Sequence, residues 1–267
     1  MSPTVAQITP LLLTYNEEPN LPRTLAALEW APEIVVVDSL STDRTCDFVR
    51  ARPGAQLYQR PFDTFANQCN FGLQHVNTSW VLSLDADYVL TPELTDEMAS
   101  LDLNGPAVGY SARFRYCVHG RPLRASLYPP RVVLYRKDRA RYRDEGHGHR
   151  VQVDGEIRPL HGMILHDDRK PLDRWFSEQN KYATREARYL IEAPAASLNR
   201  HDHVRRQIWL APLLVFLYTL FVKGLILDGW PGGLYVMQRT LAELMISLQL
   251  LEWKLAVKSP SSPVSRR

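Results

Sequence analysis

Val81-Leu82-Ser83-Leu84-Asp85-Ala86-Asp87 is an apolar run that ends in two carboxylates one residue apart. The run is too short for a free-standing helix, and it is typical of a strand buried along its whole length. In an extended chain Asp85 and Asp87 project from the same face, because successive side chains alternate. Two hard anionic ligands at the end of a buried strand suit a divalent cation such as Mg²⁺ or Mn²⁺. The alternative is an acidic loop that only faces solvent.

Strand-like and helix-like runs alternate on either side of this stretch. We predict buried strands at 8–13, 34–38, 56–59 and 80–84, and helices at 20–30, with Asn20 as N-cap, at 43–52 and 65–75, and from Pro92 onward. This alternation predicts an α/β fold whose mostly parallel sheet carries helices on both faces. Ligands bind such sheets at the carboxyl ends of the strands. Three polar clusters, at 16–18, 38–41 and 85–87, are therefore expected to meet in one crevice.

The second half of the chain has a different pattern. Residues 108–118, 131–135, 150–153 and 157–165 alternate in the manner of antiparallel strands, and a helix is predicted at 171–191. We therefore expect one domain at 1–200 with a nucleotide-binding half at 1–103 and an acceptor half at 104–200. Apolar and amphipathic helices are expected at 201–258, and a disordered tail rich in Ser and Pro at 259–267.

Composition narrows the function classes. The chain has 267 residues, 45% of them hydrophobic, and a formal net charge of +3, which does not by itself indicate nucleic-acid binding. Aromatic residues are not interleaved with the basic ones as a single-strand binder requires. The three cysteines are far apart and form no CxxC pair, so free thiols are expected. Neither a GxGxxG nor a GxxxxGK[ST] element is present, so a dehydrogenase or a P-loop enzyme would need another phosphate cradle.

Three motifs taken together resemble the successive signatures of family 2 glycosyltransferases with the GT-A fold. They are Thr14-Tyr15-Asn16-Glu17-Glu18, Val37-Asp38-Ser39-Leu40-Ser41-Thr42-Asp43 and Leu84-Asp85-Ala86-Asp87. Their order and spacing match those of the family, and the resemblance covers residues 6–190. The branch it resembles most includes the lipopolysaccharide-core β-glucosyltransferases of bacteria.

The resemblance implies a nucleotide-sugar donor, a UDP-sugar in this branch, and a bridging metal ion, Mg²⁺ or Mn²⁺. Of Asp85 and Asp87, the resemblance assigns the metal first to Asp87. The residues that the resemblance assigns to the nucleotide sugar are Thr14, Tyr15, Asn16, Glu17, Asp38, Ser41 and Asp85. For Asp38 the alternative is a loop or helix-capping aspartate, since Ser39, Ser41 and Thr42 also suit a cap.

Family 2 enzymes invert the anomeric carbon and need a general base for the acceptor hydroxyl. Relatives have a His-Glu pair before a Val-rich strand, whereas here His149 stands where that glutamate is expected. We therefore predict Glu145, and after it Asp144, as the base. His147 is a candidate for a metal or diphosphate contact. Both histidines are open to a second interpretation, as polar residues beside an arginine-rich surface.

Residues 165–170, Leu-His-Asp-Asp-Arg-Lys, form a second polar cluster. By resemblance His166 completes the metal shell, and Arg169 and Lys170 meet the diphosphate. The alternative is a helix-start cluster whose acids favour the helix N-terminus. The arginines between 113 and 143 fit an anionic acceptor or, equally, a solvated face.

The apolar end of the chain predicts membrane contact. Residues 208–227 carry one charge, Lys223, and a break is expected at 229–233. Residues 241, 244, 245, 248 and 251 make an apolar stripe. We favour helices lying in the plane of the cytoplasmic leaflet over a soluble core or a homo-oligomer interface, and rank a single span last.

These observations predict an inverting, metal-dependent hexosyltransferase on the cytoplasmic face of a bacterial inner membrane. Its acceptor would be a lipid-linked saccharide of lipopolysaccharide or another surface polysaccharide. The rival predictions are a sugar nucleotidyltransferase, which should carry a Gly-rich triphosphate loop, and a non-catalytic membrane protein that binds nucleotide sugars.

Overall fold

The structure is a computed structural model that describes residues 4–145 and 148–258; the side chains of 144, 145, 148–150, 257 and 258 lie outside the description. Two compact units make up the chain, residues 1–170 and 171–267. The helix that the sequence assigned to the acceptor half, at 171–191, belongs to the second unit. The tail predicted to be disordered, 259–267, lies outside the described residues.

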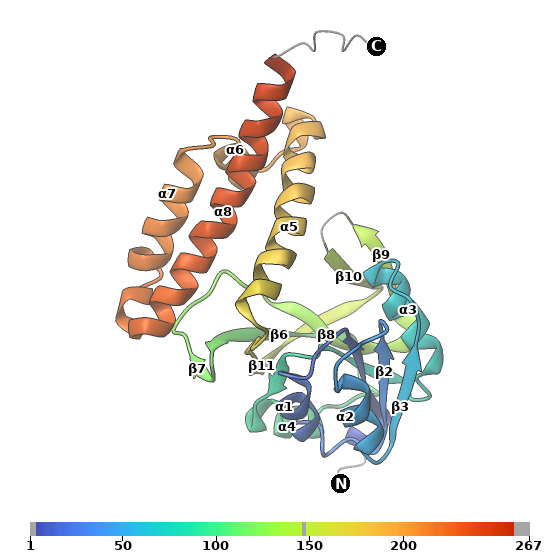
Figure 1. The fold of residues 1–267 in the computed structure, drawn as a ribbon. Helices are drawn as coiled ribbons and strands as arrows, with labels where there is room; N and C mark the ends of the chain where they lie inside the picture. Colours follow the sequence, from blue (N-terminus) through green and yellow to red (C-terminus); the bar gives the residue numbers. More distant parts are fainter. Residues whose placement is uncertain (1–3, 146–147, 259–267) are drawn as a thin grey trace. The chain divides into compact units, whose positions relative to one another are not determined.

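The first unit contains all the described strands and four α-helices (Figure 1). Its elements, in chain order, are η1 (Val5–Gln7), β1 (Ile8–Thr14), α1 (Leu21–Ala26), β2 (Ile34–Asp38), α2 (Thr45–Ala51), β3 (Ala55–Gln59), α3 (Phe65–His75), β4 (Trp80–Asp85), β5 (Tyr88–Leu90), α4 (Pro92–Ala99), β6 (Ala107–Val118), β7 (Arg121–Pro122), β8 (Arg131–Arg136), η2 (Lys137–Arg139), β9 (Ala140–Glu145), β10 (Gly148–Val153) and β11 (Glu156–His166).

The main sheet is mixed, with strand order β3-β2-β1-β4-β8-β6-β11-β5. Strands β3, β2, β1 and β4 are parallel, which confirms the predicted α/β class. Strand β8 runs antiparallel to both β4 and β6, while β9 and β10 form a separate antiparallel pair. Each segment expected to be antiparallel has an antiparallel partner, which for β11 is β5, but β6 and β11 also pair with each other in parallel. Alternating hydrophobicity reports how a strand's two faces are covered, not its direction, and the long connection through β8–β10 returns the chain in the same sense.

Helices cover both faces of the sheet, as predicted, and neighbouring valines of β2 contribute to opposite cores. Val36 packs in one core with residues of α1, α2 and α4, while Val35 and Val37 pack in the other with α3. Helix α3 lies so close to β1 that a Cβ added at Gly72 would come within 2.4 Å of Leu11. The three cysteines are buried and free, in agreement with the sequence.

The strand registers align the polar ends of three strands. Thr14 of β1 is paired with Asp38 of β2, and Leu13 of β1 with Asp85 of β4. At the other end of the order, His166 of β11 pairs with Tyr88 of β5, directly after Asp87. These strand pairings therefore place residues far apart in sequence at one edge of the sheet.

The second unit is helical. It contains α5 (Leu172–Glu192), η3 (Ala195–Ser197), α6 (Arg200–Arg205), α7 (Leu210–Leu217), a π-helical turn η4 (Tyr218–Val222), η5 (Leu225–Asp228) and α8 (Gly229–Lys258). Helices α5 and α8 share a core that includes Leu190, Ile246 and Leu250. Arg205 forms ion pairs with Glu186 at 2.6 Å and with Glu243 at 2.9 Å, so the charge of Glu243 is buried and paired inside the unit.

The break expected at 229–233 is confirmed only at its first residue, Gly229, which has φ of 64° and stands between η5 and the rest of α8, while residues 230–233 are helical. A further break lies between η4 and η5, where Gly224 is left-handed with φ of 69°. Pro231 is accommodated in the first turn of α8, where a missing N–H costs nothing. In the predicted apolar stripe of α8, Leu244 and Leu248 are exposed, whereas the helix buries Ala242, Ile246 and Leu250.

No single helix in the described part of the chain is long and apolar enough to cross a bilayer. One pair, Leu210–Val222 followed by Leu225–Ala256, meets the length and composition criteria together and is bent by 65°.

Candidate active site

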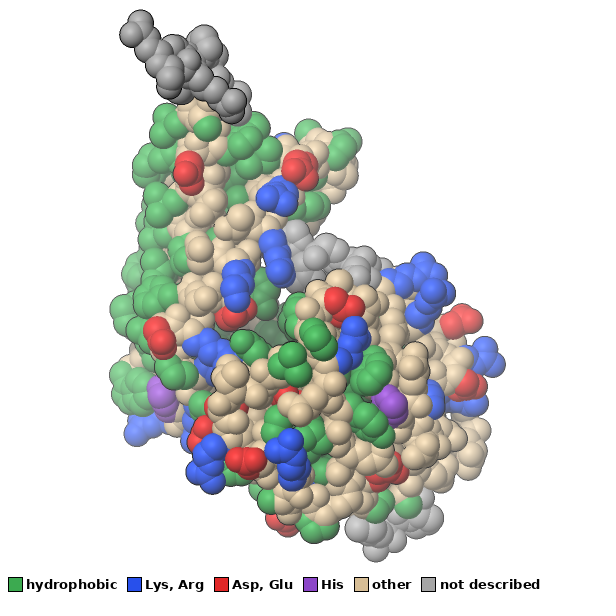
Figure 2. Space-filling view, turned by 45° about the vertical axis from the view of Figure 1, so that its right-hand side comes forward, with side chains coloured by type: hydrophobic (Ala, Val, Ile, Leu, Met, Phe, Trp, Pro, Cys, Tyr) green, Lys and Arg blue, Asp and Glu red, His purple; other side chains and the backbone are tan. Residues whose placement is uncertain are grey.

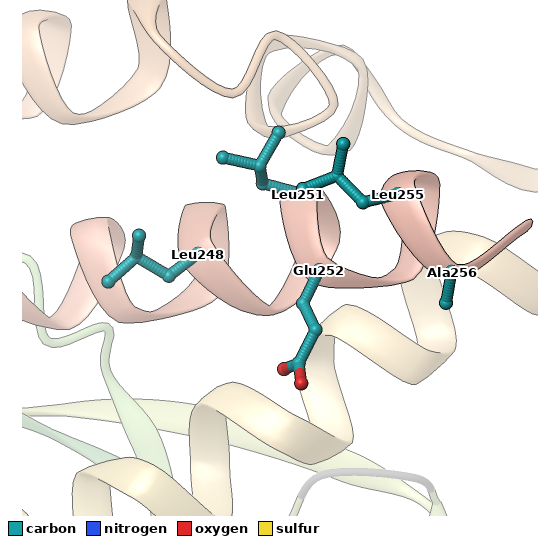
Figure 3. A pocket seen from close by; sticks show the side chains of 5 residues that line it. All are labelled: Leu248, Leu251, Glu252, Leu255 and Ala256. Atoms are coloured by element: carbon teal, nitrogen blue, oxygen red, sulfur yellow. The ribbon is translucent and has the colours of Figure 1, made fainter. Parts of the chain in front are cut away.

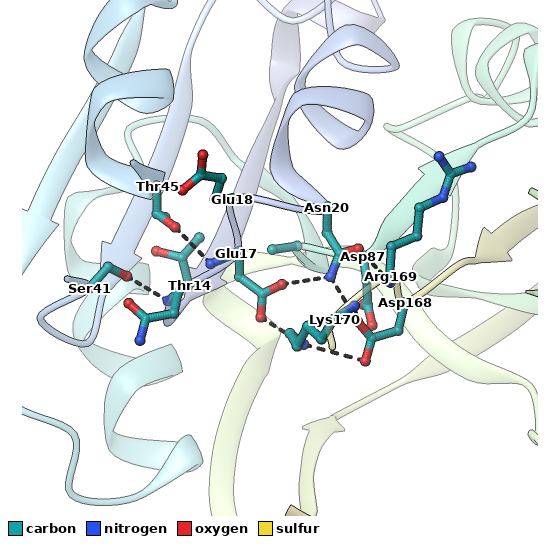
Figure 4. Close-up of polar contacts among 12 residues, drawn as sticks. Thr14, Glu17, Glu18, Asn20, Ser41, Thr45, Asp87, Asp168, Arg169 and Lys170 are labelled. Atoms are coloured by element: carbon teal, nitrogen blue, oxygen red, sulfur yellow. Dashed lines mark hydrogen bonds and ion pairs between the residues drawn. The ribbon is translucent and has the colours of Figure 1, made fainter. Parts of the chain in front are cut away.

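Four polar segments converge at the carboxyl edge of the sheet (Figure 4). They are the loop after β1 at 15–20, the loop after β2 at 39–44, the turn between β4 and β5 at 86–87, and the residues after β11 at 167–170. The first three are the clusters that the sequence predicted to meet. The fourth joins them because β11 ends beside β5.

Asp38 organises the loop after β2. Its buried carboxylate accepts hydrogen bonds from Thr14 Oγ1 at 2.8 Å, from the main-chain N–H and hydroxyl of Ser41, and from Gln59 Nε2 at 3.2 Å. Burial opposes ionisation, but these hydrogen bonds outweigh it and hold the pKa of Asp38 below its usual range. The carboxylate is thus ionised and already bonded within the protein, and its contact with a nucleotide stays a prediction.

The loops after β1 and β2 are tied to each other through Asn16. Its N–H donates to Ser41 Oγ at 2.8 Å, and its side-chain oxygen accepts from the N–H of Thr42 at 2.7 Å. Asn16 and Leu40 are both left-handed, with φ of 51° and 62°. Asparagine tolerates this conformation, whereas leucine there is strained. Tyr15, also predicted to contact the donor, is about half exposed, at 49%.

Glu17 is the buried carboxylate of the loop after β1. Its N–H donates to Thr45 Oγ1 at 2.7 Å, and its carboxylate faces Lys170 Nζ at 2.9 Å and Asn20 Nδ2 at 2.9 Å. Burial raises the pKa of Glu17 to about 7, although Lys170 opposes the rise. Near neutral pH, both the protonated and the ionised form of Glu17 are therefore populated.

Asn20 is a residue whose role the sequence reading missed. It stands at the N-cap position of α1, but its side chain caps nothing there. The side-chain amide turns instead toward Glu17, Asp168 and the main chain of Arg169. The spacing of a cap residue before a helical stripe could not reveal partners almost 150 positions away.

Asp87 and His166 form the centre of the predicted metal site. Asp87 Oδ2 lies 3.1 Å from His166 Nε2, and the main-chain oxygen of Asp87 accepts from the N–H of Asp167. Burial alone would raise the pKa of Asp87, but His166 outweighs it and lowers that pKa to about 2. The carboxylate in turn raises the pKa of His166 against the effect of burial. Asp85 ends β4, while Asp87 lies in the turn that follows.

The surroundings of this pair are aromatic. The rings of Tyr88, Tyr116 and Tyr128 pack edge-on against the imidazole of His166. Thr24 of α1 donates to the main-chain oxygen of Ala86 at 2.6 Å, which fixes the turn that carries Asp87. None of these tyrosines was assigned a role from the sequence, because each lies in a strand or loop without a distinctive motif.

Arg169 and Lys170, the two predicted diphosphate contacts, are already paired. Arg169 contacts Asp167 at 2.8 Å, and Lys170 contacts Glu17 at 2.9 Å and Asp168 at 3.6 Å. The surrounding carboxylates hold the pKa of Lys170 well above its usual value despite burial. Both side chains would have to exchange these partners, or share them, to meet an anionic ligand.

The residues present fit a divalent cation that takes few ligands from the protein. Within residues 4–145 and 148–258, no three His, Cys, Asp or Glu side chains are arranged to hold a metal ion by themselves. Mg²⁺ in phosphate-transfer sites is commonly held by one or two carboxylates plus substrate phosphates and water. Asp87, with Asp85 and His166 near it, supplies such a set. His147, also predicted as a ligand, lies outside the described residues.

The predicted bases, Asp144 and Glu145, are at the end of β9, where the described backbone pairs them with His149 and Gly148 of β10. Their side chains lie outside the described residues. The base of this hairpin is anchored by Tyr142, whose hydroxyl donates to Ser83 of β4 at 2.8 Å. Asn70 of α3 bonds the main-chain N–H and C=O of Tyr142 as well. The hairpin is therefore fixed to the strand that leads to Asp85.

Comparison with known proteins identifies the family. The family model described as Glycosyl transferase family 2 matches residues 11–154, more than half of the chain. The chain belongs to this family. The match spans the three motifs on which the sequence resemblance rested, and it favours glycosyl transfer over nucleotidyl transfer.

Two curated relatives align with the chain over most of their length. The lipopolysaccharide core biosynthesis glycosyltransferase LpsC of Rhizobium meliloti is 26% identical over 239 residues, which cover 86% of each chain. An uncharacterized glycosyltransferase of Rickettsia prowazekii is 23% identical over 85% of this chain and 80% of its own.

Among solved structures, the mannosyltransferase PcManGT of Pyrobaculum calidifontis, in complex with GDP-Man and Mn²⁺, is similar with a TM-score of 0.51. It is 17% identical, and the alignment covers 95% of this chain and 88% of that one. This likeness confirms the predicted GT-A architecture.

Proposed function

We propose that this family 2 glycosyltransferase is an inverting, metal-dependent enzyme that moves a hexose from a UDP-sugar to a lipid-linked saccharide. The acceptor would belong to lipopolysaccharide or another bacterial surface polysaccharide. The observation that carries the proposal is the convergence of Glu17, Asp87, His166 and Lys170 at the carboxyl edge of the sheet.

Donor binding at this edge is supported by the type of loops found there. Parallel α/β sheets bind ligands where adjacent strand ends open into loops, and β1, β2 and β4 do so here. The structurally similar mannosyltransferase was solved with a nucleotide sugar and Mn²⁺, which agrees with this donor class. The choice of UDP and of lipopolysaccharide rests on the resemblance and on LpsC.

A divalent metal, Mg²⁺ or Mn²⁺, would be held by Asp87 with Asp85 and His166. Bound there, it would neutralise the charge that develops on the departing nucleoside diphosphate. Asp87 suits this role because its pKa of about 2 keeps it ionised at neutral pH. Lys170 and Arg169 would add positive charge on the same side once they share it with the diphosphate.

Inversion requires attack from the face opposite the diphosphate, with a base that removes the acceptor proton. Glu145 or Asp144 would be that base. The support is their place on β9, which Tyr142 fixes to the strand leading into Asp85.

The function is tested by incubating the purified protein with UDP-glucose, Mn²⁺ or Mg²⁺, and truncated lipopolysaccharide. We expect UDP release that depends on acceptor, stops with EDTA and returns with added metal. The anomeric proton coupling of the product, read by nuclear magnetic resonance, should indicate a β-linkage from the α-linked donor. Transfer that continues unchanged in excess EDTA, or a product with retained configuration, would overturn the proposal.

We also propose that the helical unit binds the cytoplasmic face of the inner membrane. Figure 2 shows hydrophobic side chains gathered along this unit. Trp209, Val222 and Leu227 are 79%, 72% and 70% exposed, although they are apolar. An open, mostly apolar pocket also lies on α8. It is lined by Leu248, Leu251, Glu252, Leu255 and Ala256 (Figure 3). Contiguous exposed apolar surface of this kind is typical of interfaces with membranes or proteins.

The membrane proposal predicts a loss of vesicle binding when charge is placed on this surface. The double variant Phe221→Glu/Leu227→Glu should bind vesicles of phosphatidylethanolamine and phosphatidylglycerol at least about 10-fold more weakly, because two exposed apolar anchors are lost. Leu172→Glu, at an exposed leucine of α5, is the matched control. Co-sedimentation of the double variant at the wild-type level would contradict the proposal.

A further inference from the structure

Asn20 makes four side-chain hydrogen bonds at the edge of the sheet. It is fully buried, and both ends of its amide are used twice. Nδ2 donates to Glu17 Oε2 and to Asp168 Oδ1, each at 2.9 Å. Oδ1 accepts from the main-chain N–H of Arg169 at 2.8 Å and from Arg23 at 2.9 Å. The neutral amide suits this position, because it supplies two N–H donors and an acceptor oxygen, whereas an ionised carboxylate can only accept.

These bonds connect two segments that are almost 150 residues apart. One is the loop after β1, which carries Glu17, and the other is the segment after β11, which carries Lys170 (Figure 4). Asp168, held by Asn20, also accepts from the N–H of Lys170 at 3.1 Å. The ammonium of Lys170 then reaches back to Glu17 at 2.9 Å, so the two segments close a ring of contacts around Asn20.

The attachment of the two segments does not depend on Asn20 alone. Arg23 pairs with Asp167 at 2.6 Å and also bonds the main-chain oxygen of Asp167. Because this second tie holds the segment after β11 to α1, loss of the Asn20 bonds should alter the position of Asp168 and Lys170 without detaching the segment. A shift of Asp168 and Lys170 within a segment that stays attached would indicate a positioning role for Asn20, whereas detachment of the segment would indicate a purely stabilising role.

We propose that Asn20 is a positioning residue for donor binding, which sets Lys170 against Glu17 at the diphosphate side of the site. The inference rests on the proposed function, in that the donor diphosphate is taken to bind at this edge. Asn20 does not touch the donor in this account. It acts through Lys170, which must lie where it can share its charge with the diphosphate.

The test uses Asn20→Asp in the full-length protein. The substitution keeps the size and the two acceptor contacts, but it removes both N–H donors and places a carboxylate between Glu17 and Asp168. We expect the dissociation constant of UDP, titrated calorimetrically in the presence of Mn²⁺, to rise at least about 10-fold, or about 1.4 kcal/mol. The stoichiometry should remain near one. A purely structural defect would lower the stoichiometry by reducing the folded fraction and leave the dissociation constant unchanged.

Two further variants complete the experiment. Asn77→Asp is the matched control, since Asn77 also donates to a carboxylate, that of Glu33 at 3.4 Å, but lies exposed before β4 at the opposite ends of the strands. Its affinity for UDP should equal that of the wild type. If Asn20 acts only through Lys170, both substitutions remove the same contribution to UDP binding. The double variant Asn20→Asp/Lys170→Met should therefore bind UDP no more weakly than the weaker-binding single variant.

The outcomes separate this inference from the proposed function. If wild-type protein does not bind UDP with Mn²⁺, the proposed function fails. If the wild type binds and folded Asn20→Asp binds equally well, or if the two substitutions add fully, the positioning role fails. Should Asn20→Asp not fold, Asn20→Ser is measured in the same way, with the same expected loss of affinity and the same criteria.

Discussion

Asp87→Asn is expected to lower kcat/KM for sugar transfer by about 10²-fold to 10⁴-fold, since it removes the charge that binds the metal and thereby stabilises the leaving diphosphate. Asparagine preserves the size of the side chain and can still meet His166, which lies 3.1 Å away. The loss should therefore reflect charge rather than a collapsed site. UDP release by wild type and variant, over a range of Mn²⁺ concentrations, measures the effect.

The control for this substitution is Asp138→Asn. Asp138 is an exposed carboxylate of the same unit, paired with Arg136 at 3.0 Å. Its replacement should leave transfer within about twofold of the wild type, because exposed ion pairs contribute little. An Asp87→Asn enzyme with wild-type activity at saturating and at limiting Mn²⁺ would remove Asp87 from the mechanism.

Glu145→Gln is the second substitution with a large expected effect. If Glu145 is the general base, kcat should fall by about 10²-fold to 10⁴-fold while UDP affinity stays at the wild-type value. Asp144→Asn is measured beside it, because the sequence left both carboxylates open. Single-turnover transfer and UDP calorimetry, performed on each variant, separate the chemical step from donor binding.

Asp154→Asn provides the matched control within the same part of the chain. Asp154 follows β10, its side chain is exposed, and its main-chain N–H bonds the oxygen of Arg139. This variant should keep full activity. If Glu145→Gln and Asp144→Asn both transfer sugar at the wild-type rate, the base lies elsewhere.

Most strands and helices of the first unit, though not β5, β7 or β9, could be predicted because their patterns are local. β2 is bounded by the same residues, 34 and 38, in the prediction and in the structure, and α3 by 65 and 75. A run of buried β-branched residues leaves few alternatives to a strand. The meeting of three polar clusters followed from the same information, since parallel strands bring their carboxyl ends to one edge.

The sequence could not reveal contacts that depend on the order of distant strands. The antiparallel pairing of β11 with β5 brings His166 to Asp87, and no local pattern specifies it. Asn20 illustrates the same limit, because a cap position was chosen from spacing while its partners lie beyond β11. The pairing of Lys170 with Glu17 was likewise hidden, since a basic residue in a motif does not disclose whether its charge is already paired.

The central claim is that this edge of the sheet binds a nucleoside diphosphate through a metal ion. Calorimetric titration of UDP into the wild-type protein, with Mn²⁺ and again after its removal by EDTA, tests it most directly. The account predicts binding at one site that weakens at least about 10-fold without metal. Absence of UDP binding in the presence of Mn²⁺, or the same affinity with and without the metal, would contradict it.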